Sequence, residues 1–205
     1  MKIGVLSYQG DVSEHMDAVR ATGNEPVAVK SVSSLQTVGG LILPGGESTC
    51  QGKLLVRFGL DEPIRARIYE GMPVFGTCTG AILLAKEIEG SSQPRLGTMD
   101  ILIARNAFGA QVDSFETDMH IKGITDDPNY GIGPFRAFFI RAPLIRHAGP
   151  HVDVMATYDG NIVLARQGNM LACSFHPEMG EDLRVHMYFA GMVEDFLSKK
   201  KEAVG

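Results

Sequence analysis

Cysteine is scarce in this chain of 205 residues, and tryptophan is absent. The three cysteines, Cys50, Cys78 and Cys173, form no C-x-x-C pair, and an odd number leaves at least one unpaired. This argues against a disulfide framework and a structural metal site, and it is typical of a reducing cytoplasm. No apolar run reaches the length of a membrane span, and residues 1–7 predict a strand rather than a signal peptide. We therefore expect a cytoplasmic protein whose function involves no metal, cofactor or membrane.

Basic residues are also few. Lys and Arg number 19 against 24 Asp and Glu, so the formal net charge is -5, and the one basic run is residues 199–201. This balance argues against a general nucleic-acid-binding protein. Hydrophobic residues make up 44% of the chain, an ordinary value for a globular protein. The length suits one domain covering residues 1–205.

The first half of the chain alternates between short apolar runs and stretches of helix-forming residues. Strands are expected at residues 2–8, 26–30, 40–44 and around 74, and helices at 12–21, 49–58, 64–70 and 81–87. Asp11 and Glu14 stand at the spacing of a capping box before the first helix. This alternation predicts an α/β fold of three layers, a mostly parallel central sheet with helices on both faces. Gln9, Gly46 and Cys78 would lie along one edge, at the carboxyl ends of the strands.

The second half is rich in strand patterns. Strands are expected at residues 99–104, 111–115, 135–140, 152–158, 161–165 and 170–175. Residues 158–161 have the composition of a hairpin turn, and residues 126–133 that of a polar surface loop. Apolar residues at helical spacing predict a final amphipathic helix over residues 182–199.

The segment Gly76-Thr77-Cys78-Thr79-Gly80 has the G-x-nucleophile-x-G spacing of a sharp strand-to-helix turn, with cysteine at the nucleophile position. The glycines are needed because the strand and helix backbones pass very close together at such a turn. Cys78 would lie at a helix N-terminus, where free N–H groups favour the thiolate, and the Thr79 N–H could donate to an oxyanion. The alternative is a buried structural cysteine at a strand end. The two flanking glycines favour the nucleophile.

A second motif, His176-Pro177-Glu178, follows the last expected strand. Pro177 favours an extended backbone at His176, which would bring the Glu178 carboxylate beside the imidazole ring and orient it. The alternative is a turn with a polar surface histidine, but together with Cys78 the motif predicts a Cys-His-Glu catalytic triad. The other histidines show no comparable partner, and His186 is expected at the surface or partly packed; they are His15, His120, His147, His151 and His186.

These motifs and several others carry a resemblance to a known family. They lie in residues 2–6, 9–10, 41–49, 73–78, 93–97, 105–109, 111–115, 138–143, 156–160 and 174–178. The chain resembles the triad-type, or class I, glutamine amidotransferases, and among them the glutaminase subunits of pyridoxal 5'-phosphate synthases. Segments 45–49 and 105–109 separate these subunits from the rest of the superfamily. The resemblance implies a flavodoxin-like class I glutamine amidotransferase fold. The chain departs from the family at Thr79, where alanine is common, and in segment 120–133, which is longer than expected.

The resemblance also implies a reaction. Cys78 would attack the side-chain amide of L-glutamine, giving a γ-glutamyl thioester and ammonia, and then L-glutamate. His176 would transfer the protons, and Glu178 would hold its ring. Backbone N–H groups of Gly46 and Thr79 would form the oxyanion hole, with Gln9 helping to switch it. The implied substrate-binding residues are Gly46, Glu47, Ser48, Arg105, Ile140 and Arg141.

The implied partner is a (β/α)8-barrel synthase subunit that uses the ammonia to build pyridoxal 5'-phosphate (vitamin B6) in a large hetero-oligomer. Two other functions fit the same triad or fold. One is a free-standing γ-glutamyl hydrolase that needs no partner. The other is a non-catalytic binding or redox-sensing protein, which has no need of His176 and Glu178, so their presence counts against it.

Overall fold

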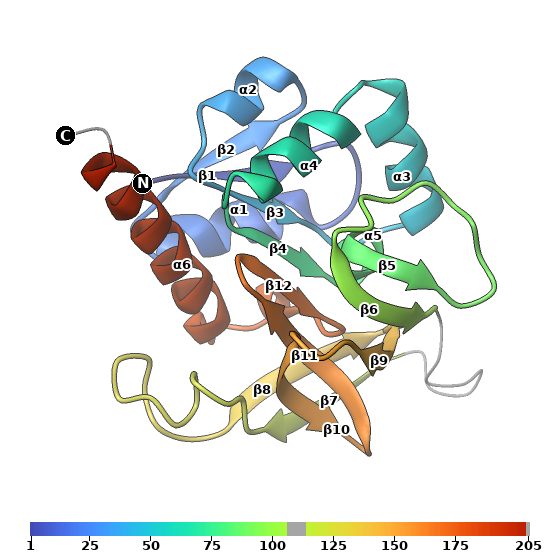
Figure 1. Ribbon diagram of the computed structural model, residues 1–205. Helices are drawn as coiled ribbons and strands as arrows, with labels where there is room; N and C mark the ends of the chain where they lie inside the picture. The colour runs from blue at the N-terminus through green and yellow to red at the C-terminus, as the bar shows by residue number, and fades with distance from the viewer. Residues whose placement is uncertain (106–113, 204–205) are drawn as a thin grey trace.

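A ten-stranded sheet forms the centre of the structure, a computed structural model that describes residues 1–105 and 114–203 (Figure 1). On one side of this sheet the described strands run parallel in the order β2-β1-β3-β4-β12. They are β1 (Lys2–Leu6), β2 (Glu25–Val29), β3 (Gly40–Leu43), β4 (Val74–Thr77) and β12 (Met170–Cys173). Because these strands are parallel, their carboxyl ends meet at one edge of the sheet.

The other side of the sheet is mainly antiparallel. β12 continues into β11 (Asn161–Gln167), β9 (Leu144–Ala148), β6 (Met99–Ala104) and β5 (Ala85–Ile88), and β10 (Asp153–Tyr158) pairs with β11. β7 (Ser114–Met119) and β8 (Phe135–Ile140) form a separate antiparallel pair. The expected α/β architecture is confirmed, with a sheet that is mixed rather than mostly parallel. Short turns contribute to this, because a strand that follows a tight turn pairs antiparallel with the strand before it. The hairpin turn predicted at residues 158–161 is one example: Asp159 and Gly160 have φ angles of 47° and 72° and connect β10 directly to β11.

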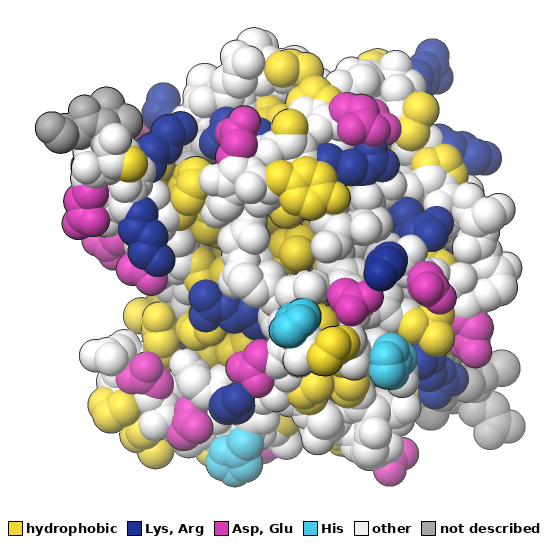
Figure 2. Space-filling view, in the orientation of Figure 1, with side chains coloured by type: hydrophobic (Ala, Val, Ile, Leu, Met, Phe, Trp, Pro, Cys, Tyr) yellow, Lys and Arg dark blue, Asp and Glu magenta, His cyan; other side chains and the backbone are white. Residues whose placement is uncertain are grey.

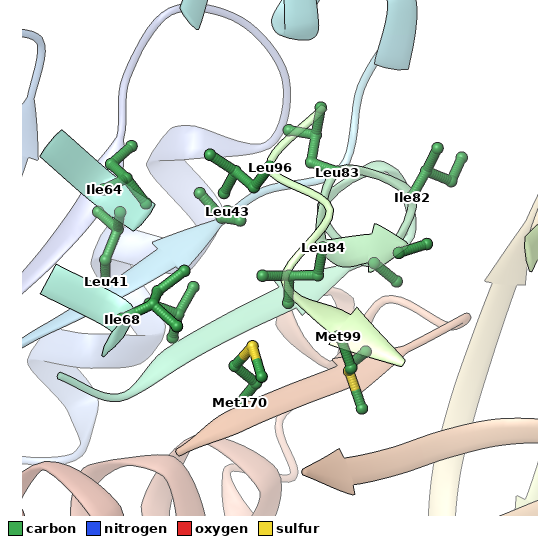
Figure 3. Packing of buried hydrophobic residues seen from close by; sticks show 14 of the residues in the cluster. Leu41, Leu43, Ile64, Ile68, Ile82, Leu83, Leu84, Leu96, Met99 and Met170 are labelled. Atoms are coloured by element: carbon green, nitrogen blue, oxygen red, sulfur yellow. The ribbon is translucent and has the colours of Figure 1, made fainter. Parts of the chain in front are cut away.

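Helices cover both faces of the sheet, so the predicted three layers are present (Figure 1). α1 (Val12–Ala21) and α6 (Arg184–Glu202) pack on one face, and α2 (Val32–Gln36), α3 (Ser48–Arg57), α4 (Asp61–Tyr69) and α5 (Thr79–Leu84) pack on the other. In β3, Leu41 and Leu43 belong to one core and Ile42 to the other, because side chains alternate across a strand. Figure 3 shows Leu41 beside Ile64 and Ile68 of α4.

One predicted helix is wrong at its end, and two short elements escape the sequence patterns. The helix expected over residues 81–87 ends at Leu84, and Ala85–Ile88 form β5, which pairs with β6. The first and last residues of β5 are buried and the two between them are exposed, so pairing and burial override the helix propensity of this segment. α2 and β9 have five residues each, too few to show a clear period.

Part of the predicted strand at residues 111–115 lies outside the described residues, as does most of the motif at 105–109, and β7 begins at Ser114. The final helix confirms its prediction, with bounds that differ by a few residues. None of the helices in the described ranges is long and apolar enough to cross a bilayer. On the face drawn in Figure 2, Lys and Arg side chains are interspersed with Asp and Glu rather than gathered into a basic surface.

A close backbone approach between α5 and β3 generates a stability prediction. A Cβ at Gly80 would lie 1.9 Å from the Leu43 carbonyl oxygen, whereas a Cβ at Gly23 would meet no atom within 4 Å. We expect Gly80→Ala to lower the free energy of unfolding by about 3 kcal/mol or more, because backbone must move. Gly23→Ala should cost only about 1–2 kcal/mol, from its positive φ of 77°. Urea unfolding measures both, and equal losses would contradict the contact.

Candidate functional site

A cavity of about 480 Å³ opens at the carboxyl ends of the parallel strands. Its walls include the segments that follow β1, β3, β4 and β12, the edge where the sequence predicts a site. The lining residues are Gln9, Gly10, Asp11, Gly46, Glu47, Ser48, Cys78, Thr79, Ile82, Arg105, Ile140, Arg141, His176 and Met179. Every predicted site residue is therefore in this wall except Glu178, which is buried beside His176.

Cys78 lies on a strained turn between β4 and α5. Its φ of 49° and ψ of -103° are unusual for a residue with a side chain, and its N–H donates to the Cys173 carbonyl oxygen at 2.8 Å. The glycines on either side are required by contact. A Cβ at Gly76 would lie 2.4 Å from the carbonyl carbon of Gly80, and Gly80 in turn touches β3. The predicted turn is therefore present, and it directs Cys78 into the cavity from the N-terminus of α5.

His176 faces two carboxylates at one ring nitrogen. Its Nδ1 lies 2.7 Å from Glu178 Oε1 and 3.3 Å from Asp11 Oδ2. Burial alone would lower the pKa of His176, but its hydrogen bonds to Asp11, Cys78 and Glu178 raise that pKa from 6.5 to about 12. The imidazole is thus held in its charged form, with the Nδ1–H donating to carboxylate and Nε2 left for the sulfur of Cys78.

Glu178 reaches His176 by a backbone route that differs from the predicted one. Pro177–Met179 form a short 3-10 helix rather than extended chain, and the carboxylate meets the ring across this turn. Proline favours such a start because its fixed φ suits a helical turn and its missing N–H is not needed there. Burial raises the pKa of the Glu178 carboxyl, and the hydrogen bond from His176 opposes that shift. The predicted pair is present in a different geometry.

Asp11 is a site residue that the sequence reasoning missed. The predicted capping box is wrong, because the Asp11 side chain makes no cap hydrogen bond and Glu14 accepts from Ser13 instead. Asp11 faces His176, whose charged ring is a stronger hydrogen-bond donor than a backbone N–H. The available signal was the position of Asp11 just after β1, at the edge that also holds Cys78.

The expectation that His15 and His186 have no partner comparable to that of His176, with His186 at the surface or partly packed, is wrong. Both are buried, and His15 Nδ1 lies 3.1 Å from His186 Nε2. His15 Nε2 lies 2.9 Å from Thr77 Oγ1 and 3.4 Å from Glu178 Oε2. These histidines therefore extend the polar cluster from Glu178 into the core between α1 and α6.

The helical period could have placed both histidines inside. His15 lies between Val12 and Val19 on the inward stripe of α1, at spacings of three and four residues. His186 stands three residues before Phe189 on the inward stripe of α6. Residues at these spacings share one helix face, so an apolar stripe that contains a histidine indicates a buried histidine with a partner.

The loop after β3 is fixed by hydrogen bonds on both sides of Gly46, whose φ of 147° is readily adopted only by glycine. The Gly45 carbonyl accepts from the Asp11 N–H at 3.3 Å and from the Gln51 side chain at 3.2 Å. The Gly46 carbonyl accepts from the Thr79 hydroxyl at 2.6 Å. Thr79, the departure noted in the sequence, therefore ties this loop to the turn that carries Cys78.

Several predicted substrate-binding residues already have partners in the cavity wall. Glu47 caps α3 by accepting from the N–H groups of Thr49 and Cys50 at 3.0 and 2.6 Å. Burial would raise the pKa of Glu47, but these hydrogen bonds lower it overall. Arg105 donates to Gln93 Oε1 at 2.7 Å, which fixes one end of its guanidinium.

The remaining predicted residues enter the cavity from other elements. Gln9 accepts the Glu47 N–H at 2.9 Å, and Ser48 is the buried first residue of α3. Ile140 ends β8, and Arg141 follows it with a φ of 44°. The two arginines and the loop after β3 thus face one small space.

Asp11, His176 and Glu178 also have the composition of a metal site, since one ligand atom from each lies within 4.8 Å of the others. Their shared atom is His176 Nδ1, whose proton is accepted by Glu178 at 2.7 Å. A protonated ring nitrogen donates a hydrogen bond and does not bind a metal. A charged histidine held by two carboxylates accounts for the cluster.

A larger cavity, of about 850 Å³, lies at the opposite ends of the strands. Its wall includes Pro73, before β4, Asn169, before β12, and Phe196 and Lys199 of α6. Figure 2 shows hydrophobic side chains beside Lys and Arg in this region. None of its lining residues is a cysteine or a histidine, so we place the chemistry in the smaller cavity.

Comparison with known proteins agrees with the predicted family. Residues 5–195 match the model of the SNO glutamine amidotransferase family. The pyridoxal 5'-phosphate synthase subunit PdxT of Carboxydothermus hydrogenoformans is 55% identical over 92% of this chain and 96% of that protein. The protein of the same name from Thermotoga maritima is 52% identical over 95% of this chain and 100% of that protein.

Solved structures confirm the predicted class I glutamine amidotransferase fold. A crystal structure described as a glutamine amidotransferase has a TM-score of 0.87 and 46% identity, covering 94% of this chain and 98% of its own. The structure of PurLQS from Thermotoga maritima has a TM-score of 0.70 at 17% identity and covers 96% of this chain and 98% of its own. The second likeness concerns the fold alone.

The buried histidine of α6 generates a prediction about pH. The pKa of His186 is lowered by burial from 6.5 to about 4. Between these pH values His186 is protonated in the unfolded chain and neutral in the native state. The free energy of unfolding therefore falls as pH falls from 6.5 to 4. The full loss from this group is about 3 kcal/mol. His176 acts in the opposite direction near pH 6.5, where the unfolded chain is still taking up its proton, and adds little slope below about pH 5.5, where its raised pKa keeps it protonated in both states.

We therefore expect a His186→Phe variant to lose less stability than the unchanged protein on acidification across this range. Urea unfolding at several pH values between 6.5 and 4 measures the difference in slope. Parallel slopes would show that His186 takes up its proton in the native state, contrary to its burial.

Proposed function

Because this chain belongs to the SNO glutamine amidotransferase family, we propose that it is the glutaminase subunit of a pyridoxal 5'-phosphate synthase and hydrolyses L-glutamine to L-glutamate and ammonia. The observation that carries the proposal is a cavity in which Cys78, at a helix N-terminus, meets a histidine held by two carboxylates. Relatives above 50% identity over nearly the whole chain are named as subunits of this synthase. This argues against a free-standing γ-glutamyl hydrolase and a non-catalytic protein.

The reaction has two halves. The Cys78 thiolate attacks the amide carbon of the glutamine side chain, and the C–N bond breaks as His176 gives its proton to the leaving ammonia. The γ-glutamyl group is then a thioester on Cys78. In the second half His176 takes a proton from water, the hydroxide attacks the thioester, and the C–S bond breaks to release glutamate and the thiolate.

His176 can serve both halves because its environment favours the charged ring. Glu178 and Asp11 oppose its Nδ1 side, so the proton that moves is the one on Nε2, toward Cys78. Glu178 orients the ring from below the cavity wall, where the carboxylate is sheltered from water.

The oxyanion hole consists of the N–H groups of Gly46 and Thr79. In a trans peptide the N–H points opposite to the carbonyl, and the Gly45 carbonyl is bound to Asp11 and Gln51. The Gly46 N–H is therefore turned away from those groups. The Thr79 N–H lies at the first turn of α5, where backbone donors have no partner within the helix. Both donors would stabilise the negative charge that develops on the amide oxygen.

Substrate glutamine is held by the backbone of Gly46, Glu47 and Ser48, by Arg105 and by the Ile140–Arg141 segment. A guanidinium suits the α-carboxylate because its donors form a planar fork. Arg105 donates from Nη1 to Gln93 and Thr49, and its Nε and Nη2 donors have no hydrogen-bond partner among the described residues. The cavity volume of about 480 Å³ lies in the range of small-molecule sites.

The ammonia passes to a synthase subunit with a (β/α)8 barrel, in a large hetero-oligomer in which this chain contributes one glutaminase domain covering residues 1–205. Docking of that subunit favours the orientation of the Gly45–Gly46 peptide described above, whereas in the isolated chain a glycine pair can turn over without a side-chain clash. Gln9, bound to the next N–H along the loop, lies where docking could act. Loss of one oxyanion donor is worth about 100- to 1000-fold in rate, enough to gate the enzyme.

This proposal predicts that the isolated chain hydrolyses glutamine slowly and that an equimolar synthase subunit raises kcat by about 100-fold or more. The measurement is glutamate and ammonia release with and without the synthase subunit. Full activity in isolation, unchanged on mixing, would contradict the partner-dependent function and favour a free-standing hydrolase.

Two cysteine variants control this experiment. Cys78→Ala should show no hydrolysis above background even with the synthase subunit, because no thioester can form. Cys50→Ala, at an exposed position, should match the unchanged protein. Activity that survives Cys78→Ala would refute the assigned nucleophile.

A further inference from the structure

A line of buried polar groups continues from the triad into the core. His176 Nδ1 contacts Glu178 Oε1 at 2.7 Å, and the other carboxylate oxygen, Oε2, faces His15 Nε2 at 3.4 Å. His15 Nδ1 then faces His186 Nε2 at 3.1 Å. These groups come from α1 and from the segment that runs from the turn after β12 into α6, so two distant parts of the chain meet in one line.

Glu178 Oε2 is the atom through which these buried histidines could affect the triad. It is buried, and within the described ranges it makes no conventional hydrogen bond. A buried carboxylate oxygen without a donor is costly, and the cost is lowest when the group is protonated. A protonated Glu178 would no longer stabilise a charged His176. The ring of His15 can supply a donor to this oxygen, because its Nε2 faces Oε2 at 3.4 Å.

Among the residues that the structure describes, the other titratable groups around Glu178 do not supply this donor. His176 and Asp11 lie on the Oε1 side of the carboxylate, at the shared Nδ1. Cys173, on β12, has its thiol bonded to the Phe175 carbonyl, and burial raises the pKa of that thiol well above its usual value. His15 is therefore the group whose proton can be shared with Oε2.

Burial and geometry together determine which ring nitrogens carry protons. Burial, His186 and His176 hold the pKa of His15 well below 6.5, so the ring is neutral and has one N–H. A lone pair on Nε2 would point at an anionic oxygen, so the proton belongs on Nε2, shared between Glu178 Oε2 and Thr77 Oγ1. Nδ1 of His15 must then accept, and Nε2 of His186 donates to it. His186 Nδ1 is left as an acceptor, and it has no partner among the described residues.

A purely structural role does not explain this arrangement. The surrounding cluster is apolar, with Phe75 in edge contact with both rings, and aliphatic residues would fill the space without the cost of burying two imidazoles. The contacts from His186 to His15 end at the Glu178 carboxylate, which is the group that orients His176.

We propose that His15 is a positioning residue for the triad: its Nε2–H holds the second oxygen of Glu178, which keeps the carboxylate ionised and aimed at His176, while His186 fixes the tautomer of His15. The proposal rests on the triad chemistry proposed above. Neither His15 nor His186 lines the cavity, so neither contacts substrate.

The test is the pH dependence of glutamine hydrolysis by the complex with the synthase subunit. We expect His15→Phe to lower kcat by about 10- to 100-fold, the usual effect of removing a group that orients a catalytic residue, with KM nearly unchanged. The acid limb of the kcat profile should move to higher pH, because Glu178 without its donor takes up a proton more readily. His15→Gln, which restores an amide donor, should recover part of both effects.

Val19→Ala is the matched control for destabilisation, since Val19 is buried on the same helix and its side chain has no polar group to share with Glu178. It should lower the unfolding temperature without moving the acid limb. If His15→Phe behaves like this control, His15 is a structural residue and the proposal is wrong. If the unchanged complex shows no glutaminase activity, the proposed function fails instead.

A second measurement needs no variant. Nitrogen-15 NMR of the imidazole rings in the unchanged protein reports which ring nitrogen carries the proton. The proposal requires His15 as the neutral Nε2–H tautomer near pH 7. A His15 ring protonated on Nδ1 alone would overturn it.

Discussion

The site depends on one backbone contact, the approach of α5 to β3 at Gly80. With 1.9 Å between an added Cβ and the Leu43 carbonyl oxygen, no side chain fits, and the helix can begin directly beneath the sheet edge. That position forces Cys78 into a left-handed backbone conformation and turns its side chain toward the cavity. The parallel strands β1, β3 and β12 then bring the glycine loop, Asp11 and His176 to the same edge, because parallel strands end together.

The two sides of the cavity are supported by different kinds of packing, apolar behind Cys78 and polar behind His176. α5 is buried along its whole length and has an apolar core behind it, so Cys78 rests on close-packed residues. Under His176 the packing is different: Glu178, His15 and His186 are buried polar groups that face one another in a line, at 3.4 Å and 3.1 Å. Such a network is stable when its members are paired, and it fixes their orientation for the same reason. The turn after β4 therefore positions the Cys78 sulfur, and the network positions the His176 ring.

The sequence was informative where chemistry and local backbone coincide. The sharp turn at Cys78 could be predicted from the glycines on either side of it. The pairing of His176 with Glu178 could be predicted from their spacing of two residues. Asp11 could not, because its partner His176 is distant in the chain and the same residue fits a helix cap equally well. His15 was missed although its place on the apolar stripe of α1 indicated burial. The segment after Leu84 was assigned to helix because strand pairing with β6 is a tertiary effect that propensity does not include.

The central claim is that Cys78 is the nucleophile for the side-chain amide of glutamine. A diazoketone analogue of glutamine places an electrophilic carbon where the amide carbon would lie, and mass spectrometry of the digested protein locates the resulting adduct. The account predicts one adduct, on Cys78, formed faster with the synthase subunit and prevented by excess glutamine. Labelling of Cys50 alone, or of Cys78 at a rate that glutamine does not slow, would contradict it.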